Sequence, residues 1–133
     1  MENMRHGEIT SRIIGAAMKV HTKLGSGFLE VIYQRALAME LQSAGLDHVR
    51  EAVVDIHYNG EVIGERRVDF IVAGLICVEI KAMNQLEPGH ISQVKNYLNV
   101  FRMDIGLLIN FGSSSLEFKR IEHWERTSRT GMQ

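Results

Sequence analysis

The first third of the chain repeats its apolar residues at the spacing of an α-helix. From Glu8 to Leu24 they recur every three or four positions, which places them on one face of a helix. The glycines within 25–27 end this helix, and a second helical pattern follows and ends at Gly45. The apolar faces of the two predicted helices are formed by Ile9, Ile13, Ala16, Ala17, Val20 and Leu24, and by Leu29, Ile32, Tyr33, Ala36, Leu37, Leu41 and Ala44.

Beyond these helices the apolar residues alternate with polar ones, which is the pattern of β-strands. Asn59-Gly60 is the strongest short signal for a hairpin, and Ala73-Gly74 marks a second turn. The pattern therefore predicts an antiparallel meander of three strands, over residues 52–58, about 61–72 and 75–82.

The last part of the pattern contains one helix between two short strands. Pro88 suits the first turn of a helix that covers about residues 90–101. The flanking strands are predicted at 104–111 and at about 116–121. Because a helix separates the strand at 104–111 from the one at 75–82, these two strands should run parallel through a right-handed crossover.

Together these elements predict an α+β fold with a mixed sheet, in the order helix, helix, three strands, helix and two strands. A chain of 133 residues with no repeat and no low-complexity tract predicts a single domain over residues 1–133. Its core should cover about residues 7–123, and residues 125–133 form a polar tail.

Charge and cysteine content narrow the classes of function. With 15 Lys and Arg against 16 Asp and Glu, the chain has no basic excess, so any nucleic-acid binding must rest on a local patch. Cys77 is the single cysteine, which excludes a disulfide within the chain and is typical of a reducing cytoplasm. No apolar run approaches the roughly 18 residues of a membrane span, so we expect a cytoplasmic protein that does not bind membranes.

Three charges interrupt the apolar segment 68–82, namely Asp69, Glu79 and Lys81. Glu79 and Lys81 are two residues apart in a strand, so they project from one face, about 6–7 Å apart at roughly 3.3 Å per residue. The position of Asp69 depends on the turn. A two-residue loop would place Asp69 opposite Val78 and away from Glu79, whereas a three-residue loop would pair Asp69 with Glu79, and the glycine permits either loop.

The three-residue loop would place two carboxylates directly opposite each other, which is destabilising without compensation. A divalent cation is one compensation, because Mg²⁺ prefers carboxylates together with water and phosphate oxygens. The alternative is a solvated sheet edge on which Lys81 simply pairs with Asp69.

Several segments resemble one protein family. "VDF" (68–70) followed by "VEIKA" (78–82) resembles the Asp…(Asp/Glu)-x-Lys signature of the PD-(D/E)xK nuclease superfamily, and "GFLEVIY" (27–33) fits the Gly-x-x-Glu-x-x-Tyr pattern of its small GxxExxY family. "IIGAAMKVHTKLGSGFLE", "EPGHISQVKNYL" and "IGLLINFG" are similar to that family's segments in the same order, so that the resemblance spans about residues 7–123. It implies the restriction-endonuclease-like core of that superfamily.

The resemblance implies a role for each residue of the signature. Asp69, Glu79 and the backbone carbonyl of Ile80 would ligate Mg²⁺, with Mn²⁺ as a substitute, and Lys81 would be the motif lysine. Glu30 matches an acid on the helix before the sheet, which completes such sites directly or through water. From the sequence alone, Glu30 could equally be a first-turn acid that the helix dipole favours.

Three further residues would support the site. Gln93 and Tyr97 resemble a Gln-x-x-x-Tyr motif of RecB-like nucleases, in which this helix assists the site and the nearby nucleic acid. Tyr33 lies three residues after Glu30 and so on the same helix face. Without the resemblance, Tyr97 would be interpreted as a half-buried tyrosine that hydrogen-bonds to Gln93.

The resemblance implies a Mg²⁺-dependent nuclease that hydrolyses phosphodiester bonds of nucleic acid, DNA rather than RNA. Its catalytic set would be Asp69, Glu79, Lys81, Glu30 and Gln93. The resemblance is also compatible with a homodimer, because superfamily members that cut both strands often pair. The rival hypothesis is a nucleic-acid-binding or protein-interaction module that keeps the fold without turnover.

Overall fold

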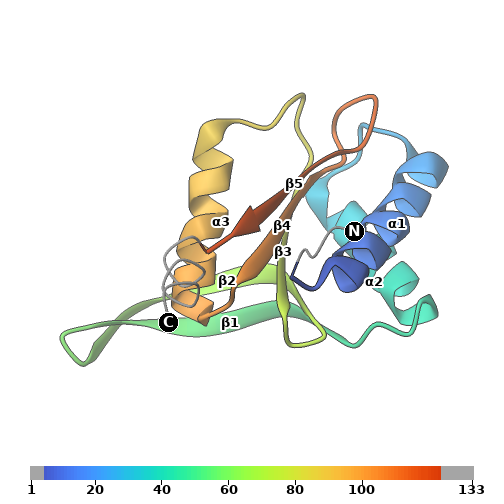
Figure 1. Ribbon diagram of the computed structural model, residues 1–133. Coiled ribbons are helices and arrows are strands. Elements are labelled where there is room, and N and C mark those ends of the chain that lie inside the picture. The colour runs from blue at the N-terminus through green and yellow to red at the C-terminus, as the bar shows by residue number, and fades with distance from the viewer. Residues whose placement is uncertain (1–4, 124–133) are drawn as a thin grey trace.

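The structure is a computed structural model that describes residues 5–123 (Figure 1). Its elements are α1 (Gly7–Leu24), α2 (Glu30–Ser43), β1 (His48–Tyr58), β2 (Glu61–Val72), β3 (Ile76–Lys81), α3 (Pro88–Phe101), β4 (Ile105–Asn110) and β5 (Glu117–Glu122). The predicted α+β class and the predicted order of elements are confirmed. The tail expected at residues 125–133 lies outside the described residues.

The five strands form one mixed sheet in the order β1-β2-β3-β4-β5. Neighbouring strands are antiparallel except for β3 and β4, which are parallel from Ile76↔Ile105 to Lys81↔Asn110. The predicted parallel pairing of these two strands, with α3 between them in the chain, is therefore confirmed. β1 begins at His48, earlier than the expected residue 52, because its first residues pair with the buried end of β2, beginning with His48↔Val72.

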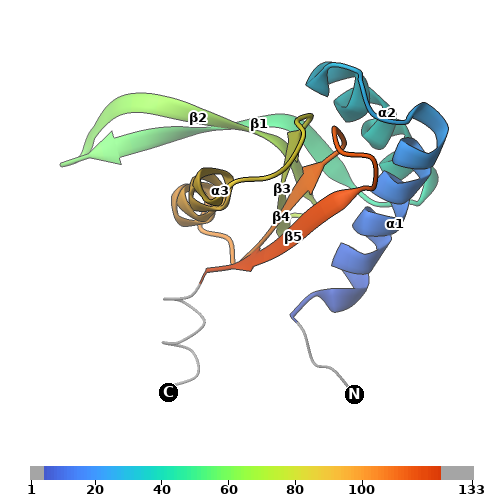
Figure 2. The same ribbon diagram turned by 90° about the horizontal axis from the view of Figure 1, so that it is seen from above.

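Helices cover both faces of the sheet (Figure 2). On one face, α1 and α2 pack on a cluster that we call the α1/α2 core, which includes Ile13, Val20, Leu37, Phe70, Val78 and Leu107. On the other face, α3 packs on the α3 core, which includes Val68, Cys77, Val94, Tyr97, Leu98 and Leu108. β3 and β4 are therefore buried on both faces, which explains their nearly continuous apolar sequences. Within residues 5–123 no helix combines the length and apolarity needed to cross a membrane.

The hairpin of β1 and β2 extends past the rest of the molecule (Figure 1). We call its outer part, residues 53–67, the arm. Its turn is the expected Asn59-Gly60, with φ of 50° and 82°. Large apolar side chains on the arm are exposed, among them Tyr58 at 67% and Ile63 at 65%.

The turn between β2 and β3 is a three-residue loop. The ladder ends at Val72↔Ile76, and Leu75 N–H donates to the Val72 carbonyl at 2.9 Å. Ala73 and Gly74 both have positive φ, 55° and 66°. Gly74 accepts this conformation without strain, whereas Ala73 has a Cβ atom that disfavours it.

We expect Ala73→Gly to stabilise the protein by about 1 kcal/mol, because it relieves the left-handed conformation of Ala73. Ala38→Gly, in the interior of α2, should instead destabilise it by about 1 kcal/mol. Urea unfolding followed by circular dichroism measures both changes. Equal destabilisation by the two substitutions would contradict the strain at Ala73.

Candidate metal centre

The candidate site lies where β2 and β3 separate. Their ladder runs from Val72↔Ile76 to Phe70↔Val78, and the next position brings Asp69 to Glu79. Of the two loops left open by the sequence, the structure has the one that places these two carboxylates together. Beyond this point β2 turns away from β3 into the arm (Figure 1).

β2 changes its buried face at Asp69. Phe70 belongs to the α1/α2 core and Val68 to the α3 core, although residues two apart in a regular strand share a face. On β1, Glu51 lies between the pairs Arg50↔Phe70 and Ala52↔Val68 and has a φ of 55°. The local twist of both strands therefore centres on Asp69.

Two N–H groups hold the Asp69 carboxylate. Ile80 N–H donates to Oδ2 at 2.7 Å, and the side-chain Nε2 of Gln34 donates to Oδ1 at 2.7 Å. The bond from Ile80 N–H takes the place of a backbone hydrogen bond to β2, because the ladder between β2 and β3 stops before Ile80. Asp69 is thus fixed from both β3 and α2.

Glu79 is only 8% exposed and contacts Asp69. Burial, followed by the charge of Asp69 and a hydrogen bond to it, raises the pKa of Glu79 to about 8, while the charge of Lys81 acts in the opposite direction. Lys81 Nζ lies 3.8 Å from Glu79 Oε2, so the lysine pairs with Glu79 rather than with Asp69 as the alternative proposed. Oε1 of Glu79 is buried and has no hydrogen-bond partner among the described residues.

This arrangement fits a divalent cation. A buried carboxylate oxygen without a donor, beside a second carboxylate, offers hard oxygen ligands at a position where a positive charge would offset the repulsion. Such an ion would replace the proton that Glu79 otherwise retains, because a ligating carboxylate must be ionised.

α2 reaches the site through a residue that the sequence analysis missed. Glu30 is the exposed first residue of α2. Within residues 5–123, no group of three His, Cys, Asp or Glu side chains lies together so that it could hold a metal ion. The role of Glu30 at the site, direct or through water, therefore stays a prediction. Gln34, one turn later and 5% exposed, makes the contact to Asp69. The sequence does contain a signal for Gln34. It follows Tyr33 and precedes Leu37 and Leu41 by three and seven residues, so helical spacing places this polar residue on the buried face of α2.

α3 covers the site from the opposite face. Tyr97 is 4% exposed, and burial, followed by the charge of Glu79, raises its pKa to about 12, against the charge of Arg66. Oε1 of Gln93 is buried without a hydrogen-bond partner among the described residues, so it does not accept a bond from the Tyr97 hydroxyl. The simple tyrosine–glutamine pair is therefore not formed through this oxygen.

Tyr33 acts on the backbone before α2 rather than on the carboxylates. Its hydroxyl donates to the Gly25 carbonyl at 2.5 Å and accepts from Phe28 N–H at 3.2 Å. Its ring stacks on Phe111, with centroids 4.7 Å apart. Tyr33 thereby ties the glycine-rich loop to the end of β4 and fixes where α2 starts.

At Cys77, burial and the charges of Glu79 and Asp69 raise the pKa of the thiol, which keeps it protonated.

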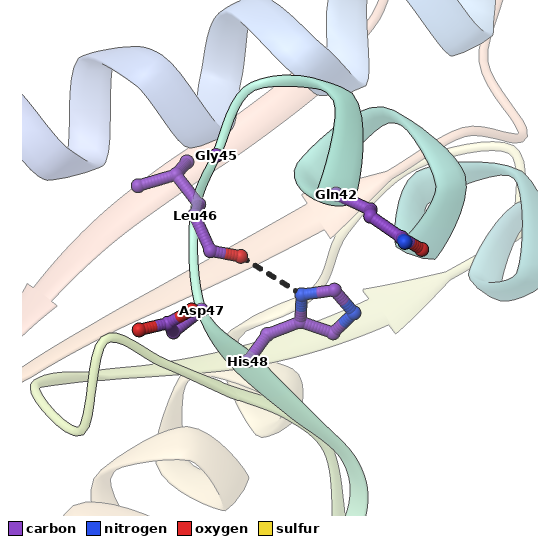
Figure 3. A pocket seen from close by; sticks show the side chains of 5 residues that line it. All are labelled: Gln42, Gly45, Leu46, Asp47 and His48. Carbon is purple, nitrogen blue, oxygen red and sulfur yellow. Dashed lines mark hydrogen bonds between the residues drawn. The ribbon is translucent and has the colours of Figure 1, made fainter.

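A separate pocket of about 230 Å³ lies at the far end of α2 (Figure 3). It is lined by Gln42, Gly45, Leu46, Asp47 and His48. His48 Nδ1 hydrogen-bonds to the Leu46 carbonyl at 3.0 Å, while Asp47 points away from the imidazole. None of the residues of the candidate site lines this pocket.

Comparisons with known proteins identify the family and the fold of the chain. A family model described as the PD-(D/E)XK nuclease superfamily matches residues 7–121, and the chain belongs to this superfamily. Such nucleases typically use divalent metals. No curated protein matches the sequence.

Two solved structures share the fold. The crystal structure of SSO0001 has a TM-score of 0.57 and 21% identity, over 76% of this chain and 55% of that one, so the chain spans little more than half of that protein. An alkaline exonuclease from Laribacter hongkongensis has a TM-score of 0.52 and 14% identity, over 98% of this chain and 76% of that one. The restriction-endonuclease-like core expected from the sequence is confirmed.

The raised pKa of Glu79 predicts how stability depends on pH without metal. Between its ordinary value of 4.5 and about 8, the folded protein retains a proton on Glu79 that the unfolded chain releases. Stability in EDTA should therefore fall as pH rises through this window, by on the order of a few kcal/mol. Glu79→Gln should remove this part of the slope, as measured by urea unfolding at a series of pH values. Parallel curves for the two proteins would contradict the assignment.

Proposed function

We propose that the protein is a Mg²⁺-dependent nuclease that hydrolyses phosphodiester bonds of DNA, with Mn²⁺ as a substitute metal. The observation that carries this proposal is the pair of the half-buried Asp69 and the buried Glu79. One Glu79 oxygen lacks a hydrogen-bond partner among the described residues, while Lys81 lies 3.8 Å from the other. Membership of the nuclease superfamily supports the same conclusion.

The roles follow from the chemistry of each group. Asp69 and Glu79, with the Ile80 carbonyl, would hold the ion, which polarises the scissile phosphate and lowers the pKa of bound water. The ammonium of Lys81, whose side chain is 15% exposed, would orient the attacking water and stabilise negative charge that develops on the phosphate. Glu30 would order the outer shell through water, and Gln93 would contact Lys81 or the substrate.

Positive charge near the site is limited. Arg66 acts on Tyr97, and Lys95 on α3 is exposed, but Arg67 already pairs with Glu51 at 3.1 Å. Few phosphate contacts give weak binding with a shallow dependence on salt. We therefore propose that the bound substrate is held mainly at the metal centre. We also propose that a second copy of the chain is needed if both strands of DNA are cut.

Two finer assignments complete the proposal. The Gly27, Glu30 and Tyr33 pattern supports the GxxExxY family within the superfamily. The buried free thiol of Cys77 is compatible with a reducing cytoplasm.

The rival function is a module that binds nucleic acid or protein and has lost turnover. Under this hypothesis the protein keeps the nuclease fold, and nothing that it does depends on Glu79. The signature residues are all present, and this favours catalysis over the rival.

Substitution of the site tests the proposal directly. Glu79→Ala and Lys81→Met should each reduce cleavage of supercoiled plasmid in Mg²⁺ at least ~100-fold, because each removes a group that stabilises charge in the transition state. Glu65→Gln, at an exposed position of the arm, is the matched control and should cleave like the wild type. The proposal fails if Glu79→Ala cleaves at the wild-type rate, and a wild type that binds Mn²⁺ but cleaves neither DNA nor RNA supports the rival.

A further inference from the structure

Gln34 brings a buried amide to the candidate metal centre, and neither the nuclease signature nor the Gly-x-x-Glu-x-x-Tyr pattern gives it a role. It lies on α2 and is 5% exposed. Its Nε2 donates to Asp69 Oδ1 at 2.7 Å, across 35 residues of sequence. The contact therefore joins a helix to the strand that carries the candidate ligand.

This hydrogen bond fixes the orientation of the Asp69 carboxylate. The terminal torsion of an aspartate is broad, so one hydrogen bond to one oxygen leaves the plane of the carboxylate free to rotate. Ile80 N–H holds Oδ2 and Gln34 holds Oδ1. With a donor on each oxygen, the plane is set, and with it the directions of the remaining lone pairs.

The amide also suits the charges around it. A lysine or arginine at position 34 would neutralise Asp69 and compete with a cation, and an acid would add a third negative charge beside Asp69 and Glu79. A neutral N–H donor orients the carboxylate and leaves its charge available.

We propose that Gln34 is a positioning residue, which orients Asp69 for a divalent cation that Asp69 shares with Glu79. This inference rests on the proposed function, because it requires the pair to hold a cation. Removal of a hydrogen-bonding partner of a metal ligand typically lowers metal affinity 10–100-fold. A purely structural role predicts lower folding stability with unchanged metal affinity.

The test is calorimetric titration of Mn²⁺ into the full chain without nucleic acid. Gln34→Met keeps the length of the side chain and removes the donor, and it should weaken Mn²⁺ binding at least ~10-fold. Gln42→Met makes the same chemical change at an exposed position of α2. Leu41→Val trims a fully buried side chain on α2 and lowers stability without removing a polar group. Both controls should bind Mn²⁺ like the wild type.

A spectroscopic measurement on the wild type keeps the test independent of how well the variant folds. The side-chain amide signal of Gln34 is assigned by triple-resonance spectra of the wild type itself. Addition of Mg²⁺ should shift this signal with the same midpoint as a calorimetric titration of Mg²⁺ into the wild type, and Asp69→Asn should shift it without metal.

The outcomes separate the two proposals. If the wild type binds Mn²⁺ and Gln34→Met binds it equally well, the positioning role is overturned and the proposed function stands. An unmoved Gln34 signal at saturating Mg²⁺ overturns it likewise. If the wild type binds no divalent metal, the proposed function fails and the role of Gln34 fails with it.

Discussion

The hydrogen bond from Ile80 N–H to the Asp69 carboxylate is the contact on which the site depends. β3 is buried, so an N–H group that points from it toward β2 needs an acceptor once the backbone of β2 has turned away. Asp69 supplies that acceptor at 2.7 Å. The same bond places a carboxylate beside Glu79, so that one side chain both completes the hydrogen bonding of the sheet and creates a concentration of negative charge.

The apolar layers on both sides decide what this charge can do. The α1/α2 core and the α3 core exclude water from β3, and a carboxylate in such surroundings is ionised only with difficulty. The proton on Glu79 and a bound cation are therefore alternative means of neutralising the same pair. Lys81, at 3.8 Å from Glu79, offsets only part of the charge. A core that was less well packed would leave the pair hydrated and weaken its preference for a cation.

The limits of prediction from sequence follow from the range of the interactions. The periodicity of apolar residues is local, and it predicted every element and the face shared by Glu79 and Lys81. The length of the loop at Ala73 was undecided, because Gly74 suits both alternatives and the register of Asp69 depends on contacts beyond the turn. Gln34 was missed for a related reason: its partner lies 35 residues away, and the sequence does not say how α2 is rotated over β2.

The arm is a structural consequence of the same hydrogen bond. Because the Asp69 carboxylate accepts the hydrogen bond from Ile80 N–H, the backbone of β2 can separate from β3 and continue with β1 past the body of the protein (Figure 1). Val68 then packs against α3 rather than α2, and Arg66, two residues further into the arm, acts on Tyr97 beside Glu79. The change of face at Asp69 thus gives the site two walls, α2 with Gln34 on one side, and α3 with the base of the arm on the other. A regular β2 would have continued its backbone pairing with β3 past Phe70 and kept Val68 on the same face of the sheet as Phe70.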